Sequence, residues 1–149
     1  MAHFVEEDHI YFDDESNTCD EALKFLANKA CELGVVESAE SAYEAFAARE
    51  AQDSTGMEAG IAIPHAMSEN ILKPAVIIAK YTDGMDWSSM DNSEIKLAIA
   101  LLIPKDQEGI KHLKNLSKIA SLILKKDICT ELVEANDAQT LADIINSNI

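Results

Sequence analysis

Two long aliphatic runs constrain the fold of this chain more than any other feature of its sequence. They read AVIIAKY at residues 75–81 and IKLAIALLIP at residues 95–104. Runs of this kind, without regular polar alternation, are typical of strands that are covered on both faces. The intervening TDGMDW carries a turn signal, which predicts that the two strands are antiparallel neighbours. A shorter strand candidate, GIAIP, lies at residues 60–64.

Two helix-start signals precede these strands. The acidic cluster at 13–15 is interpreted as a solvated loop that leads into the first of them. Thr18 and Ser38 each stand before a segment with apolar residues at helical intervals, so either hydroxyl can cap a helix. The sequence therefore predicts two helices, the first ending at Gly34 and the second near Glu50.

The C-terminal part of the chain is expected to be helical. Asp106 offers a cap for a long helix over about 108–125, and two short helical segments follow near 128–135 and 138–146. Helices on both sides of a few apolar strands make a three-layer α/β domain. We therefore expect an α/β fold with a mixed sheet of about four to five strands and helices on both faces.

Length and composition favour one domain. The chain has 149 residues, of which 48% are hydrophobic. This is enough for a hydrophobic core that folds without disulfides or a structural metal. Its three Pro and five Gly leave no room for a long linker. The expected organisation is a single domain over residues 1–149.

The charge balance is strongly acidic. Lys and Arg number 12 against 27 Asp and Glu, which gives a net charge of −15. Nucleic-acid phosphates and anionic lipid surfaces repel such a chain, so we expect neither nucleic acid nor a membrane among its partners. The sequence shows neither a signal-peptide pattern nor an apolar run of about 18 residues. We therefore expect a cytoplasmic protein.

The cysteines do not form a recognisable framework. Cys19, Cys31 and Cys129 are odd in number and widely spaced, and no C-x-x-C pair is present. This pattern argues against both a disulfide framework and a zinc cluster. We expect buried or inert thiols, no metal site and no cofactor.

His65 is the strongest candidate for chemistry. Pro64 fixes the backbone just before it, so the strand is expected to end or to meet the sheet edge there, with the imidazole on a stiff support. A neutral imidazole is a competent nucleophile near neutral pH, because its ordinary pKa is about 6.5. Taken alone, His65 is equally a polar residue that ends a strand.

The other histidines differ in context. His3 and His9 lie in the acidic start of the chain and receive no role. His112 heads a line that continues through Ile119 and Ile123 at helical spacing, and this line is expected to face the sheet. At the head of that line, His112 would lie beside a helix N-terminus, whose free N–H groups favour anions. A partly buried structural histidine fits the same position.

Five motifs follow one another in a specific order and spacing. They are ARE at 48–50, STGMEAGIAIPHA at 54–66, MDWSSMDN at 85–92, ALLIPKDQEG at 100–109 and HLKNLSKIASLI at 112–123. In these motifs the chain resembles the fructose/mannitol-type enzyme IIA domains of the bacterial phosphoenolpyruvate-dependent sugar phosphotransferase system. The resemblance covers nearly the whole chain. It implies that His65 takes a phosphoryl group from phospho-HPr and gives it to the sugar-specific IIB component, with Arg49 and His112 at the same site.

Three residues before His65 fit that chemistry. Phosphoryl transfer has a loose transition state with charge on the equatorial oxygens, so a protein catalyses it by positioning and electrostatic stabilisation. Arg49 offers a planar fork for phosphate oxygens, while Ser54 and Thr55 offer hydroxyls in a turn that can also direct N–H groups. An exposed helix-end arginine and a simple turn are the plainer interpretations.

One departure is GMEAG in place of the family's frequent GIGNG, which puts the carboxylate of Glu58 near the expected phosphate site.

The resemblance leaves two functions open. The first is a transport phosphocarrier that relays phosphate from HPr to a fructose-like IIB component during sugar uptake. The second is a regulatory IIA protein of the nitrogen-related branch, which binds target proteins according to its phosphorylation state. TGM, MDW and the LLIP to HLKNLSKIA segment resemble the sugar branch more, so transport is the favoured hypothesis. An acidic interaction domain without phosphorylation is the non-catalytic alternative.

Overall fold

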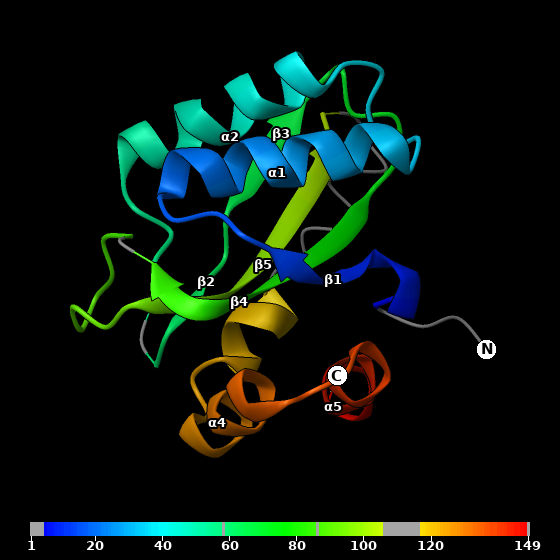
Figure 1. The fold of residues 1–149 in the computed structure, drawn as a ribbon. Helices are drawn as coiled ribbons and strands as arrows, with labels where there is room; N and C mark the ends of the chain where they lie inside the picture. The colour runs from blue at the N-terminus through cyan, green and yellow to red at the C-terminus, as the bar shows by residue number, and fades with distance from the viewer. Residues whose placement is uncertain (1–4, 58, 86, 106–116, 149) are drawn as a thin grey trace.

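The chain folds into three layers, with a mixed sheet between two layers of helices (Figure 1). The computed structural model describes residues 5–57, 59–85, 87–105 and 117–148. One helical layer consists of α1 (Cys19–Glu32) and α2 (Ala39–Gln52). The other consists of the helical residues 117–122, α4 (Lys126–Glu134) and α5 (Ala138–Ser147). The expected three-layer α/β fold is therefore confirmed.

The sheet has five strands within the described ranges. They are β1 (Ile10–Asp14), β2 (Ile61–Ala62), β3 (His65–Ser68), β4 (Ala75–Met85) and β5 (Ile95–Pro104). Their order is β1, β4, β5, β2, with β3 also paired to β5. The two long strands, β4 and β5, are antiparallel as predicted, and all other pairings are parallel. Every residue of β5 except Lys96 is buried, which explains its aliphatic composition.

The acidic cluster before α1 is only partly a loop. A short 3-10 helix, η1 (Glu7–His9), leads into β1, and β1 includes Asp13 and Asp14. The interpretation of 13–15 as a solvated loop is therefore wrong for these two residues. Asp14 is 4% exposed, and its carboxylate accepts hydrogen bonds from the main-chain N–H and the hydroxyl of Ser16, at 2.9 and 2.5 Å. These bonds make burial of the carboxylate tolerable.

Both predicted helix starts are present. The Thr18 hydroxyl accepts the N–H of Glu21 at 3.2 Å, and the Ser38 hydroxyl accepts the N–H of Ser41 at 3.3 Å. Gly34 follows α1 with a φ of +75°, a conformation that glycine adopts without steric cost.

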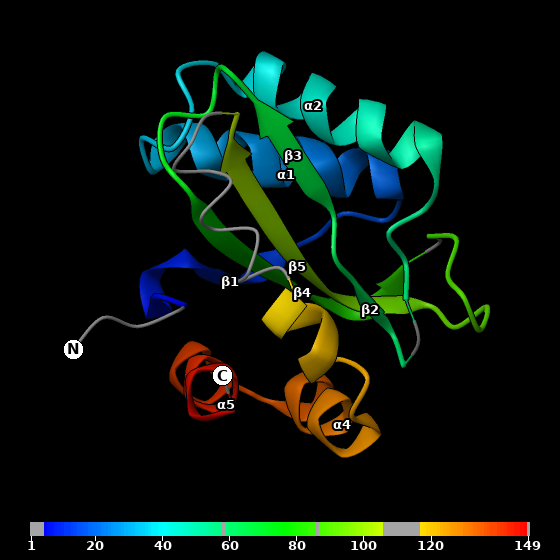
Figure 2. The ribbon, with the colours of Figure 1, turned by 180° about the vertical axis from the view of Figure 1, so that it is seen from behind.

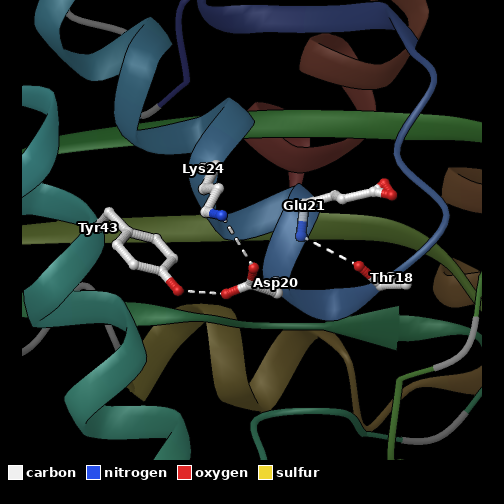
Figure 3. Close-up of polar contacts among 5 residues, drawn as sticks. All are labelled: Thr18, Asp20, Glu21, Lys24 and Tyr43. Carbon is white, nitrogen blue, oxygen red and sulfur yellow. Dashed lines mark hydrogen bonds and ion pairs between the residues drawn. The ribbon is translucent and has the colours of Figure 1, made fainter.

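Side-chain contacts tie α1 to α2 (Figure 3). Asp20 of α1 accepts a hydrogen bond from the hydroxyl of Tyr43 in α2, and it pairs with Lys24 at 3.2 Å. These contacts lie on the outer side of a helix pair whose inner side is buried, with Leu26 and Phe46 both fully buried. The pair is thus packed on the sheet through its apolar side, and it carries Arg49 at the end of α2.

The opposite layer packs through aliphatic side chains. Ile119 and Ile123 are buried against the sheet, together with Leu132 of α4 and Ile145 of α5. The prediction that the line through Ile119 and Ile123 faces the sheet is thus confirmed for these two positions. No helix among the described residues combines the length and apolarity that a bilayer crossing requires.

The three cysteines are free thiols. Cys129 is buried, while Cys19 and Cys31 are partly buried. Burial, followed by the nearby Glu50 and Asp20 carboxylates, raises the pKa of Cys19 to about 12. This thiol is therefore inert near neutral pH, as expected.

Candidate functional site

His65 lies on the edge strand of the sheet. β2 and β3 pair with β5 in one continuous register, with Ile61 opposite Leu97 and His65 opposite Leu101. Pro64 cannot donate a ladder hydrogen bond, so the pairing is interrupted there and resumes at His65 without a shift. The expected strand therefore ends at Ala62, just before Pro64, and β3 continues its register along the same side of β5 as an edge strand. Figure 2 shows this strand beside α2.

The side chain of His65 faces the layer that holds α4 and α5. Side chains alternate along a strand, and Ile61 and Ile63 both belong to the apolar cluster on that face. Leu101, opposite His65 on β5, belongs to the same cluster. His65 is therefore half-buried at the rim of an aliphatic core.

Burial makes His65 a neutral imidazole. Desolvation, followed by the charge of Arg49, lowers its pKa to about 4, although the main chain of Ile63 acts in the opposite direction. Nδ1 is buried and makes no hydrogen bond of ordinary geometry with the described residues. At pH 7 the ring is therefore uncharged.

Arg49 brings a permanent positive charge to this imidazole. It lies in the last turn of α2, and its Nη1 donates a hydrogen bond to the carbonyl of Asp53 at 2.8 Å. The guanidinium thus folds back over the end of its own helix. Its influence on the pKa of His65 places the two predicted site residues within electrostatic reach of each other.

Ser54 and Thr55 are engaged within the protein. The Ser54 hydroxyl donates to the carbonyl of Ser88 at 2.5 Å and accepts the N–H of Gly56 at 3.1 Å. Thr55 is 2% exposed, and both its N–H and its hydroxyl bind the carboxylate of Glu50. Their predicted role as phosphate ligands remains a prediction, and it would require these bonds to be exchanged.

Residues of the loop between β4 and β5, about 30 positions later in the sequence, form hydrogen bonds to the turn before His65. Asp91 accepts the N–H of Ala59 at 3.1 Å, and the Ser93 hydroxyl accepts the N–H of Gly60 at 3.2 Å. Hydrogen bonds from the Ser93 hydroxyl, then from the N–H groups of Ala59 and Ser93, lower the pKa of Asp91 to about 2. No role is predicted for Asp91 or Ser93 from the sequence. Their only signal is the density of Asp, Ser and Asn in MDWSSMDNS at 85–93, which favours side-chain to main-chain bonds.

Three predicted features lie outside the described residues. They are His112, Glu58, and the Asp106 cap with the first part of the helix expected over about 108–125, of which residues 117–122 are described and helical. The described part of the site is a neutral, half-buried imidazole on the edge strand, within electrostatic reach of an arginine and preceded by a turn that distant hydrogen bonds hold. Such an arrangement can present a nitrogen lone pair to an electrophile that carries negative charge.

Comparisons with known proteins agree with this chemistry. Residues 3–148 match the family described as "Phosphoenolpyruvate-dependent sugar phosphotransferase system, EIIA 2". The PTS system fructose-specific EIIA component of Haloferax volcanii is 34% identical over 124 residues, which cover 83% of this chain and 80% of that one. The nitrogen regulatory protein of Bradyrhizobium diazoefficiens is 33% identical over 129 residues, covering 87% and 83%. Relatives of both kinds are therefore similar to this chain.

Other relatives are much longer than this chain. The PTS system fructose-specific EIIABC component of Bacillus subtilis is 32% identical over 135 residues. The match covers 91% of this chain but 20% of that protein. The similarity therefore concerns one part of that protein.

Solved structures share the fold. The nitrogen regulatory protein IIA-Ntr from Neisseria meningitidis has a TM-score of 0.85 at 24% identity, covering 95% of this chain and 96% of that one. Enzyme IIAMTL from Escherichia coli, in its complex with phosphorylated enzyme IIBMTL, has a TM-score of 0.81 at 17% identity, covering 98% and 99%. At these identities the likeness concerns the fold.

Proposed function

We propose, from the premise that this chain belongs to the EIIA 2 family of the phosphoenolpyruvate-dependent sugar phosphotransferase system, that His65 is its phosphoryl acceptor. The family is one of phosphotransfer components, so a phosphocarrier role follows from membership. The observation that supports His65 is its state in the fold: a neutral imidazole with one buried nitrogen and an adjacent arginine. The finer proposal is that HPr is the donor, that a IIB component is the acceptor, and that the relay operates in the cytoplasm.

The proposed step needs no deprotonation of the protein. The lone pair of Nε2 attacks the phosphorus of a donor phosphohistidine, and a new N–P bond forms as the donor's N–P bond breaks. The donor ring, protonated on its other nitrogen, leaves as a neutral imidazole with the electron pair of the broken bond, so no proton has to be supplied. Nδ1 of His65 keeps its proton throughout, and Arg49 offsets charge on the transferred oxygens. In the return step the acceptor attacks and His65 is the leaving group.

The decisive experiment is phosphorylation in a reconstituted system. Incubation with phosphoenolpyruvate, enzyme I and HPr is expected to place one acid-labile phosphate on the chain. His65→Ala should abolish it, whereas the matched control His9→Ala should retain it, because His9 lies in η1 next to β1, at the opposite edge of the sheet from His65. Normal phosphorylation of His65→Ala would make the assignment wrong.

The neighbouring residues have separate proposed roles. Arg49→Lys keeps the charge but loses the planar fork, so transfer should slow by on the order of tenfold. For His112, the proposal rests on the resemblance alone: it hydrogen-bonds the phosphoryl group or orients His65. His112→Ala should then slow discharge to IIB more than acceptance from HPr. Wild-type rates in both steps would leave His112 a structural residue.

Transport and regulation remain two candidate outcomes of the same phosphorylation. The fructose-specific relative supports a fructose-like pathway, and the nitrogen regulatory relative supports the second candidate. Phosphorylated chain should pass its phosphate to a fructose-type IIB component if it is a transport carrier. A chain that accepts phosphate but does not discharge to IIB, and binds other proteins only in one phosphorylation state, would be regulatory.

A further inference from the structure

We propose that Glu50 is a positioning residue for phosphoryl transfer, because its carboxylate fixes the end of α2 to the strand that carries His65 and so keeps Arg49 beside the imidazole. This inference rests on the proposed function of His65. Glu50 touches neither His65 nor any reacting atom in the proposal. It acts through Thr55 and through its neighbour Arg49.

The first step is the set of hydrogen bonds that the Glu50 carboxylate accepts from Thr55. The N–H of Thr55 lies 3.2 Å from Oε1 and 3.1 Å from Oε2, and the Thr55 hydroxyl also binds Oε1. Thr55 is 2% exposed, so these donors have no access to water and depend on the carboxylate. None of the ion pairs among the described residues includes Glu50. Within the described part of the chain, its carboxylate therefore acts through hydrogen bonds.

The second step links Thr55 to the strand. The carbonyl of Thr55 accepts the N–H of Ile63 at 3.0 Å, two residues before His65. In the same short pairing, the N–H of Met57 donates to the carbonyl of Ile61 at 2.8 Å. One residue, Thr55, thus connects the carboxylate at the end of α2 with the edge strand of the sheet.

The third step is the coupling of Glu50 to Arg49. The two residues are adjacent at the end of α2, and both reach forward onto the turn that follows the helix. Arg49 holds the carbonyl of Asp53, while Glu50 holds the N–H and hydroxyl of Thr55. Release of Thr55 would free this turn, and the guanidinium would lose its fixed direction relative to His65. An arginine that is misplaced by about 1 Å stabilises a transition state poorly.

A double-mutant cycle tests the inference. Rates of phosphoryl acceptance from phospho-HPr are compared for wild type, Glu50→Gln, Arg49→Ala and the double variant. Glu50→Gln preserves side-chain volume, and we expect it to slow acceptance by on the order of tenfold. In the Arg49→Ala background the same change should have little further effect, because Glu50 acts through Arg49. Glu44→Gln removes one charge from an exposed position of α2 and should behave as wild type.

An NMR titration of His65 gives a readout that does not depend on transfer. If Arg49 moves away in Glu50→Gln, the pKa of His65 should rise from about 4, since a nearby cation no longer lowers it. Loss of the Glu50 charge by itself would lower that pKa, so a rise reports the arginine. An equal fold-loss in both backgrounds, or an unshifted pKa, would overturn the inference while wild-type transfer continues. A wild-type chain that accepts no phosphate would instead overturn the proposed function.

Discussion

The helix starts and the turn before His65 use the same chemistry at very different sequence separations. At the starts of α1, α2 and α5, a side-chain oxygen accepts the N–H of the residue three positions later. The accepting side chains are those of Thr18, Ser38 and Asp137. In the turn, the contacts join Ala59 and Gly60 to residues 32 and 33 positions away. The contacts of a helix start therefore lie within one short segment, whereas the site depends on a loop that lies more than 30 residues later in the sequence.

This difference separates stability from function. Loss of a local cap weakens one helix end and leaves His65 in place. Loss of a contact between the turn and the loop at 88–93 changes the support of His65 itself. Substitutions in the two regions should therefore have distinct signatures, even where they remove the same kind of hydrogen bond.

The largest effect is expected from Gly56→Ala. A Cβ at this position would lie 2.0 Å from the main-chain carbonyl oxygen of Ser88, so the turn and the loop must separate. We expect a loss of about 3 kcal/mol in unfolding free energy and a strong loss of phosphoryl acceptance. Gly34→Ala is the matched comparison: no atom lies within 4 Å of its Cβ, but φ is +75°. It should cost about 1 kcal/mol and leave acceptance unchanged. Denaturant unfolding and the transfer assay are run on both variants. Equal losses of acceptance in the two would contradict the special dependence of the site on the turn.

A smaller effect is expected from Asp91→Asn, with Asp137→Asn as its local counterpart. Both carboxylates accept main-chain N–H groups, and hydrogen bonds lower the pKa of each. At pH 7 both variants should lose thermal stability, but only Asp91→Asn should also slow phosphoryl acceptance, because only Asp91 holds the turn. The Asp91 contribution should be present above pH 3.8 and disappear as the pH falls towards 2, the folded pKa. Slowed acceptance in Asp137→Asn would contradict the separation.

The sequence predicted the self-contained features and missed the distant ones. Thr18 and Ser38 were predicted as helix caps because capping depends on residues three positions apart. The antiparallel pair β4 and β5 followed from two aliphatic runs and a turn. In contrast, the burial of Asp14 follows from the pairing of β1 with β4, which the residues around Asp14 do not encode.

In the candidate site, too, the sequence identified some residues but not the contacts that they make. His65 and Arg49 were identified from motifs, and the structure brings them within electrostatic reach. The sequence predicts that the hydroxyls of Ser54 and Thr55 bind phosphate, but in the structure Ser54 binds Ser88, 34 positions away, and Thr55 binds Glu50, five positions away. A sequence shows which groups can form hydrogen bonds. The choice of partner depends on folding, and here it involves a loop more than 30 residues away.

A third expected effect is a loss of stability at acidic pH that is linked to His65. Its folded pKa is about 4 and its ordinary pKa is 6.5, so the unfolded chain binds the proton more readily between these values. The stability linked to neutral His65 is therefore complete above pH 6.5 and is lost as the pH falls towards 4. Between pH 7 and 4, the melting temperature of wild type should fall more than that of His65→Gln. An equal fall in the melting temperatures of wild type and His65→Gln would mean that burial does not lower the pKa of His65.

The smallest effect is expected from Ser38→Ala, at the opposite end of α2 from Arg49. The Ser38 hydroxyl accepts the N–H of Ser41 at 3.3 Å, and its loss should cost about 1 kcal/mol of unfolding free energy. Phosphoryl acceptance should remain at the wild-type rate, because Phe46 is fully buried between this cap and Arg49 and holds the helix on the sheet. Urea unfolding measures the first quantity and the transfer assay the second. A slower transfer in Ser38→Ala would show that fraying at one end of α2 reaches the other, and that local caps and the site are coupled after all.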